Sequence, residues 1–144
     1  HDVAILNTDD YEYFSWENMK LVAKPCNIYD GDTFSACWYY GDKVIKYRCR
    51  CLGYDSPEMR PRLNLEGRDE VKLNALKAKE RFTELLEQDS TITLDCKEFD
   101  KYGRVLVNVY NATNGDKSLN DIMVEEEFGY AYFGGTKRWS QVIN

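Results

Sequence analysis

The fold is decided by the stretch Arg48-Cys49-Arg50-Cys51-Leu52-Gly53-Tyr54-Asp55-Ser56-Pro57-Glu58. Successive side chains of a β-strand point to opposite faces, so the two arginines are expected on one face and the two cysteines on the other. Gly53 and Pro57 then break the strand pattern and predict a sharp turn that carries two carboxylates. Charges of opposite sign therefore lie close together around a rigid bend, an arrangement that suits a site for a metal ion and a phosphate group.

Two more strands precede this stretch and predict a meander. The three expected strands cover Lys20–Tyr29, with an interruption near Pro25, then Phe34–Tyr40 and Lys43–Leu52. The first two are joined by a turn at Asp30-Gly31-Asp32-Thr33, and the last two by the two-residue hairpin signal Gly41-Asp42. The meander leads directly into the turn at Asp55.

The rest of the chain predicts two helices and two further strands. Apolar residues at helical spacing predict a long helix over Asp69–Gln88, and Ser118 caps a short helix over Leu119–Phe128. Strands are expected at Thr91–Lys97 and Arg104–Asn111, while the aromatic and glycine-rich residues 129–144 remain unassigned. The predicted class is mainly β (α+β): a five-stranded OB-fold barrel with a long helix after strand 3 and a short helix after strand 5.

Composition describes a single globular domain. The 144 residues are 43% hydrophobic and 31% charged, and no apolar run reaches the length of a membrane span, so no membrane partner is expected. The five cysteines are an odd number, and Cys49 and Cys51 lack the spacing of a zinc motif. Buried or half-buried free thiols in a reducing compartment are the favoured interpretation, which favours an intracellular protein but leaves a secreted form open.

The net charge of −6 is unevenly distributed along the chain. Residues 1–19 contain five acidic and no basic residues, whereas residues 43–68 contain seven basic and three acidic ones. We therefore expect an acidic, aromatic N-terminal arm at 1–18, with its end packed on the domain and its first ten residues loose, and one domain at 19–144. The field around the central stretch is expected to be positive, so the total charge does not exclude a nucleic-acid partner.

Three short motifs together resemble the staphylococcal nuclease (thermonuclease) family, over residues 20–132. That family has an Asp-Gly-Asp-Thr turn, an arginine followed five residues later by Asp-Thr-Pro-Glu, and an Asp-Lys-Tyr-Gly-Arg segment. Here the motifs stand as Asp30-Gly31-Asp32-Thr33, as Arg50 with Asp55-Ser56-Pro57-Glu58, and as Asp100-Lys101-Tyr102-Gly103-Arg104. Each motif alone is an ordinary turn, but the set in this order is specific.

The resemblance implies a role for each matching residue. Asp32, Asp55 and the backbone carbonyl of Ser56 correspond to ligands of Ca²⁺, which prefers oxygen donors, and Asp30 would orient them. Glu58 corresponds to the candidate general base, and Arg50 and Arg104 to the two catalytic arginines, whose guanidinium groups suit the charge of a phosphoryl transition state. Four residues correspond to positions that contact substrate: Lys101, Tyr102, Tyr130 and Tyr132.

The implied activity is a calcium-dependent endonuclease or phosphodiesterase. It would act on DNA and RNA with little sequence preference, favour single-stranded or frayed substrate, leave 3′-phosphate and 5′-hydroxyl ends, and work as a monomer. Two alternatives stay open: a non-catalytic nuclease-like OB module that binds nucleic acid or a protein, and a structural calcium-binding module. The sequence departs from the family pattern at Ser56, which replaces threonine, in the brevity of residues 136–144, and in its acidic arm.

Overall fold

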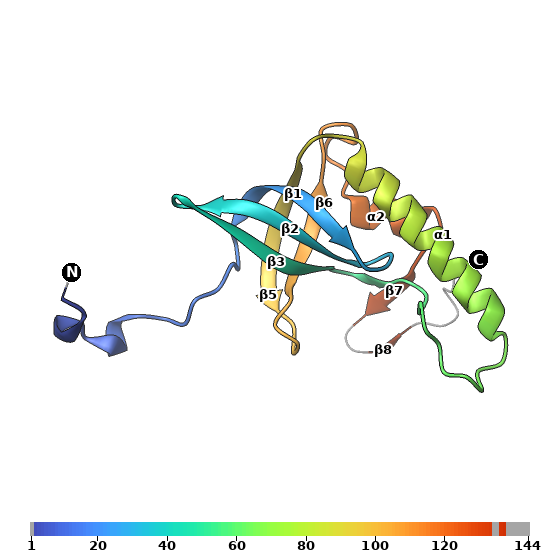
Figure 1. Ribbon diagram of the computed structural model, residues 1–144, viewed down its shortest axis with the longest axis horizontal. Helices are drawn as coiled ribbons and strands as arrows, with labels where there is room; N and C mark the ends of the chain where they lie inside the picture. Colours follow the sequence, from blue (N-terminus) through green and yellow to red (C-terminus); the bar gives the residue numbers. More distant parts are fainter. Residues whose placement is uncertain (1, 134–135, 138–144) are drawn as a thin grey trace.

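A computed structural model describes residues 2–133 and 136–137, with side chains through Gly129. Five strands form a closed barrel: β1 (Lys20–Ile28), β2 (Thr33–Tyr40), β3 (Lys43–Cys51), β5 (Ile92–Phe99) and β6 (Val105–Tyr110). The strand order is β1-β2-β3-β6-β5, and the pairing of β1 with β5 closes the barrel (Figure 1). Only the β3–β6 pair within this barrel is parallel. The expected five-stranded OB-fold barrel is confirmed.

Alternation along β2 and β3 fills the barrel interior. Phe34, Ala36 and Trp38 are buried, as are Cys49 and Cys51 on the neighbouring strand. The hairpin between the two strands turns at Gly41, whose φ of 65° is accessible to glycine at little cost. β1 runs through Pro25 without ending, and its register with β2 shifts between Pro25 and Ile28. The arginines and cysteines of β3 therefore lie on opposite faces, as the sequence predicts.

The long helix α1 (Arg68–Glu87) follows the third strand of the barrel, and the short helix α2 (Leu119–Glu125) follows the fifth. Both positions were expected. Ala75, Ala78, Phe82 and Leu85 form the buried stripe of α1. The hydroxyl oxygen of Ser118 accepts a hydrogen bond from the Asp121 N–H, which caps α2 as predicted.

The helix α2 ends at Glu125, not at Phe128 as expected. Glu127 adopts a left-handed φ of 67°, and the N–H of Phe128 donates to the carbonyl of Met123 at 2.8 Å. The N–H of Glu127 donates to the carbonyl of Val124 at 3.0 Å. These two bonds form a Schellman motif, which terminates a helix even without glycine.

A second, small sheet was not expected from the sequence. It consists of β4 (Tyr54–Asp55), β7 (Tyr130–Phe133) and β8 (Thr136–Lys137), in the order β4-β7-β8. Asp55 pairs with Tyr130 in its register, so the turn after β3 is anchored by a segment 75 residues further along the chain. A strand of two residues carries no periodic signal, which explains why the pattern alone did not predict it.

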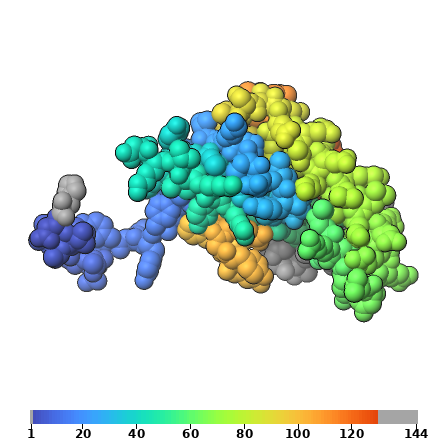
Figure 2. Space-filling view, viewed as in Figure 1, coloured from blue at the N-terminus to red at the C-terminus, as the bar shows by residue number. Residues whose placement is uncertain are grey.

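The N-terminal arm packs on the barrel only at its end. Trp16 is 3% exposed and makes edge-to-face ring contacts with Phe14, Trp38, Tyr40 and Tyr47. Two short 3-10 helices, Val3–Ile5 and Thr8–Asp10, bury no residue. Figures 1 and 2 show this part of the arm standing apart from the barrel, at the end of the molecule opposite α1.

All five cysteines are free thiols. Cys49, Cys51 and Cys96 are buried and Cys37 is half-buried, as expected, but Cys26 is exposed on β1, where a buried or half-buried thiol was expected. Burial raises the pKa of the Cys49 and Cys51 thiols, so both stay protonated at neutral pH. Among the residues that the structure describes, no helix is long and apolar enough to cross a bilayer.

The arm yields a test of where the folded domain begins. Replacing Trp16 with alanine should destabilise the protein by about 3–5 kcal/mol, because a large buried aromatic side chain is lost from a packed ring cluster. Deleting residues 1–10, which bury nothing, should leave the unfolding midpoint in urea unchanged. A Trp16→Ala variant as stable as the wild type would show that the whole arm is dispensable for folding.

Candidate nuclease site

The turn between β1 and β2 is clamped from two sides. The Asp32 N–H donates to Asp30 Oδ1 at 3.0 Å, and the Tyr54 hydroxyl donates to the Gly31 carbonyl at 2.6 Å. A Cβ at Gly31 would lie 2.9 Å from the Cβ atoms of both Ala78 and Ser56. Glycine is therefore required here by close packing against α1 and the segment after β4, and this packing fixes where Asp32 points.

The Asp32 carboxylate is buried, with the residue 3% exposed, and both of its oxygens accept hydrogen bonds. Oδ1 accepts from the Thr33 hydroxyl at 2.8 Å, and Oδ2 accepts from the Ser56 N–H at 2.9 Å. Burial, reinforced by Asp30, raises the pKa of Asp32 to about 6, although Arg50 and the Ser56 N–H act in the opposite direction. The charged form of Asp32 is therefore less favoured than it would be in water.

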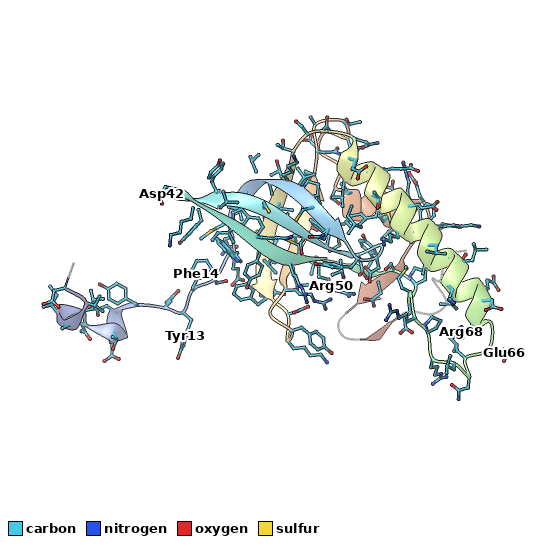
Figure 3. The ribbon with its side chains drawn as sticks, viewed as in Figure 1. Tyr13, Phe14, Asp42, Arg50, Glu66 and Arg68 are labelled. Atoms are coloured by element: carbon cyan, nitrogen blue, oxygen red, sulfur yellow. The ribbon has the colours of Figure 1, made fainter. Side chains whose placement is uncertain are left out.

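Arg50 lies at the end of β3 and contacts both carboxylates. Its Nη2 atom forms an ion pair with Asp55 Oδ1 and lies 3.3 Å from Asp32 Oδ2. Burial lowers the pKa of Arg50, but the charges of Asp32, Asp55 and Asp30 outweigh it and raise that pKa overall. Figure 3 shows Arg50 where β3 leaves the barrel, at the opposite end of the strand from Asp42. The guanidinium group thus keeps its charge and its place beside the two aspartates.

A cavity of about 630 Å³ joins this cluster to the β5–β6 turn. Arg50 and Asp55 line it on one side, and Lys101, Tyr102 and Arg104 line it from the turn. Three cationic side chains and two carboxylates, Asp55 and Asp100, therefore line one space, whose net positive charge suits a phosphate group.

Asp100 fixes the position of Arg104. Its Oδ2 accepts from Arg104 Nε at 2.7 Å, and its Oδ1 accepts from the N–H groups of Arg104 at 3.0 Å and Tyr102 at 2.9 Å. Burial raises the pKa of Asp100, but these hydrogen bonds outweigh it and lower that pKa overall. One carboxylate therefore organises the whole turn.

Tyr102 is 72% exposed at the mouth of the cavity. The Lys101 ammonium and the Arg104 guanidinium lie 5.2 Å and 5.3 Å from its ring centroid. An exposed ring between two cations is suited to stacking on a base whose phosphate the cations contact.

The structure brings together most of the residues that the sequence singles out. Asp30, Asp32, Arg50, Asp55 and Ser56 form one hydrogen-bonded and charged cluster, and the cavity connects it to Lys101, Tyr102 and Arg104. Glu58 is exposed and lies outside the residues that line the cavity. Tyr130 and Tyr132 lie in β7, but their side chains are outside the described residues.

Three residues that support the site were not assigned a role from the sequence: Tyr54, Asp100 and Asn120. Asn120 is buried, and its amide donates to the carbonyls of Leu52 and Val107 while its oxygen accepts from the Val109 N–H. It thereby joins α2 to the end of β3 and to β6. The sequence could have indicated this role. Asn120 lies beside Leu119 and near Ile122 on the apolar face of the predicted helix, and a buried asparagine needs hydrogen-bond partners.

The donor set suits a hard divalent cation. Within residues 2–129, no group of three or more His, Cys, Asp and Glu side chains is arranged as a metal site. The set implied by the resemblance has only two carboxylates, Asp32 and Asp55, with a backbone carbonyl, so this finding does not oppose it. Asp32, Asp55 and the Ser56 carbonyl are oxygen donors on neighbouring segments, the donor type that Ca²⁺ prefers.

A larger cavity of about 790 Å³ lies away from this cluster, along β5 and β6. Its lining includes Asp89, Asp95 and Asp116 and a single basic residue, Lys20. This charge has the wrong sign for a phosphate group, and no residue expected in the site lines the cavity. The smaller, basic cavity is the better candidate site.

A closed OB-type barrel with two arginines and a carboxylate cluster around one cavity defines a nuclease-like module. A family model for staphylococcal nuclease homologues matches residues 48–140. This match covers more than half of the chain, and the chain therefore belongs to that family. It includes Arg50, Asp55 and Arg104 but begins after Asp32, which the hydrogen bond from Ser56 connects to the matched region. The comparison with curated proteins gives no match.

The clamp on the Asp30–Asp32 turn yields a stability prediction. Replacing Tyr54 with phenylalanine should destabilise the protein by about 1–3 kcal/mol, since the buried Gly31 carbonyl loses its donor without replacement. Urea denaturation measures the change, and Tyr39→Phe is the control because Tyr39 is 75% exposed. Equal stability of Tyr54→Phe and the control would show that the hydroxyl does not hold the turn.

Proposed function

We propose that this protein is a calcium-dependent nuclease that hydrolyses phosphodiester bonds of DNA and RNA with little sequence preference. The observation that carries the proposal is the position of Arg50, paired with Asp32 and Asp55, across one cavity from Arg104. A purely structural calcium module would not require two arginines on the same cavity. A module that only binds nucleic acid would not require a buried carboxylate cluster behind one of them.

Each group has a defined task in the proposed reaction. Arg50 and Arg104 would contact the non-bridging oxygens of the scissile phosphate, where negative charge increases as the fifth bond to phosphorus forms. Asp100 would keep the Arg104 guanidinium aimed at the cavity, because it binds Nε and leaves the two terminal nitrogens for substrate. The planar fork of arginine suits this task better than the point charge of lysine.

Asp32, Asp55 and the Ser56 carbonyl are the groups proposed to hold Ca²⁺, with Asp30 fixing the turn. Bound there, the cation would supply positive charge to the phosphate oxygens. Lys101 and Tyr102 are proposed to contact a neighbouring phosphate and base, and Tyr130 and Tyr132 remain proposed substrate contacts. The proposed products carry 3′-phosphate and 5′-hydroxyl ends, and the proposed working form is a monomer.

Glu58 is the proposed general base. In the described part of the chain it forms no ion pair, so its carboxylate is available to accept a proton from the attacking water. It lies two residues after Ser56, in the segment that leads to α1, and its side chain is exposed. Binding of substrate in the cavity would have to bring this segment to the phosphate.

Metal dependence is the first test of this proposal. Calcium should support cleavage of a single-stranded oligonucleotide better than magnesium, since an irregular oxygen set tolerates the loose coordination of calcium. Asp32→Ala and Asp55→Ala should each abolish calcium binding in calorimetry. Asp42→Ala is the control, because Asp42 lies at the far end of β3 (Figure 3). Undiminished cleavage in excess chelator would overturn the metal requirement.

The second test separates a nuclease from a binding module. Arg50→Ala and Arg104→Ala should each lower single-turnover cleavage by about 10²–10³-fold, the usual effect of losing one donor to a transition-state oxyanion. Equilibrium binding of a short single strand should fall much less, because other basic groups still contact phosphates. Arg62→Ala is the control, since Arg62 is exposed and outside the cavity. A wild type that binds without cutting would favour the binding module.

A further inference from the structure

A row of basic side chains runs along the outer face of β3 into the cavity. Lys46, Arg48 and Arg50 are spaced by two residues and share one face, while Cys49 and Cys51 point into the core. We call these three side chains the basic row. Each step along it covers about 7 Å, twice the rise per residue of a strand. Its last member, Arg50, lines the cavity, and its first two are exposed.

The neighbouring strands widen the row. Cys37 of β2 lies between two lysines, because it pairs with Lys46 of β3 on one side and with Lys24 of β1 on the other. Lys24 thus adds a second lysine beside Lys46 on the outer face. One step closer to the cavity, Ser35 is paired with Arg48 and hydrogen-bonded to the Tyr29 hydroxyl at 3.1 Å. The Arg48 guanidinium lies 5.6 Å from the centroid of the Tyr29 ring, which fixes this side chain against an exposed aromatic group.

The charge of this face contrasts with that of the whole chain. Strands β1, β2 and β3 contain six basic residues and no Asp or Glu, in a protein whose net charge is −6. The acidic residues nearest in sequence lie beyond the strand ends: Glu17 before β1, Asp30 and Asp32 in the turn before β2, Asp42 at the hairpin tip and Asp55 after β3. A surface kept free of carboxylates and continuous with the cavity favours a polyanion that reaches both.

We propose that the basic row, with Lys24 and Tyr29, binds the phosphates of a single-stranded stretch of nucleic acid and leads it along β3 into the cavity. The inference rests on the proposed function and extends it to a substrate segment outside the reacting phosphate. An extended, flexible strand can follow regularly spaced cations along a β-strand, and the exposed Tyr29 ring adds a stacking surface. The contacts of Lys46, Arg48, Lys24 and Tyr29, outside the reacting phosphate, form equally in the ground and transition states, so these four residues act on binding and not on turnover.

The test compares two double variants with the same change in charge. Lys46→Gln/Arg48→Gln removes the two exposed members of the row, and Lys72→Gln/Lys77→Gln removes two exposed lysines of α1. Binding of a fluorescent twelve-nucleotide single strand is measured by anisotropy over a series of salt concentrations, with chelator present to prevent cleavage. The row variant should lose about tenfold in affinity at low salt, and its slope of log K against log salt should fall by about 1.4, or ~0.7 for each lost phosphate contact.

Cleavage supplies an independent readout. For the twelve-nucleotide strand, the row variant should show a raised KM with an unchanged kcat, and for a dinucleotide, which reaches only the cavity, neither constant should change. Arg48→Lys, which keeps the charge, should retain the wild-type salt slope. Circular dichroism and urea denaturation confirm that each variant is folded.

The outcomes separate this inference from the proposed function. Equal salt slopes for the row variant and wild type, or equal losses in both double variants, would overturn the inference, as would a wild type that does not bind the single strand. A wild type that binds with the expected dependence on Lys46 and Arg48 but cleaves nothing supports the inference and contradicts the nuclease.

Discussion

The buried carboxylate of Asp32 is the constraint on which the site depends. A carboxylate removed from water is costly unless hydrogen bonds and opposite charge replace its hydration. Here Thr33, Ser56 and Arg50 supply them, from the start of β2, the segment after β4 and the end of β3. The hydrogen bonds and the ion pair of the Asp32 carboxylate therefore hold three segments together, and they fix the position of Arg50.

The packing behind this cluster keeps it in place. Gly31 lies so close to Ala78 of α1 that a Cβ does not fit at Gly31, and the Tyr54 hydroxyl on β4 donates to the Gly31 carbonyl. On the other side, Asn120 of α2 binds the carbonyls of Leu52 and Val107 just beyond β3 and within β6. Helices α1 and α2 thus support the Gly31 turn and the end of β3, which carries Arg50.

Local sequence patterns predicted the elements that depend on interactions between residues close together in the chain. Alternation gave the strands of the barrel, the spacing of apolar residues gave α1, and Ser118 gave the start of α2. The charged motifs indicated eight residues, of which five line one cavity and the other three, Asp30, Asp32 and Ser56, belong to the cluster bound to it. The sheet β4-β7-β8, the Schellman end of α2 and the supporting bonds of Tyr54 and Asn120 depend on partners far along the chain, which no local pattern contains. The distance of Glu58 from the cavity lining likewise has no local signal, since its segment is placed by tertiary packing.

The net charge of −6 gives little information about the field at the cavity. Five of the acidic residues belong to the arm, which extends from the end of the molecule opposite α1 (Figure 1). Exposed charges separated by more than a Debye length, about 8 Å at physiological ionic strength, hardly affect one another. The field that a phosphate meets at the cavity is therefore set by nearby groups: the carboxylate cluster beneath it and the cations of β3 and the β5–β6 turn. An acidic protein can in this way present a basic path to a polyanion, because strands β1 to β3 carry no carboxylate between the hairpin tip and the site.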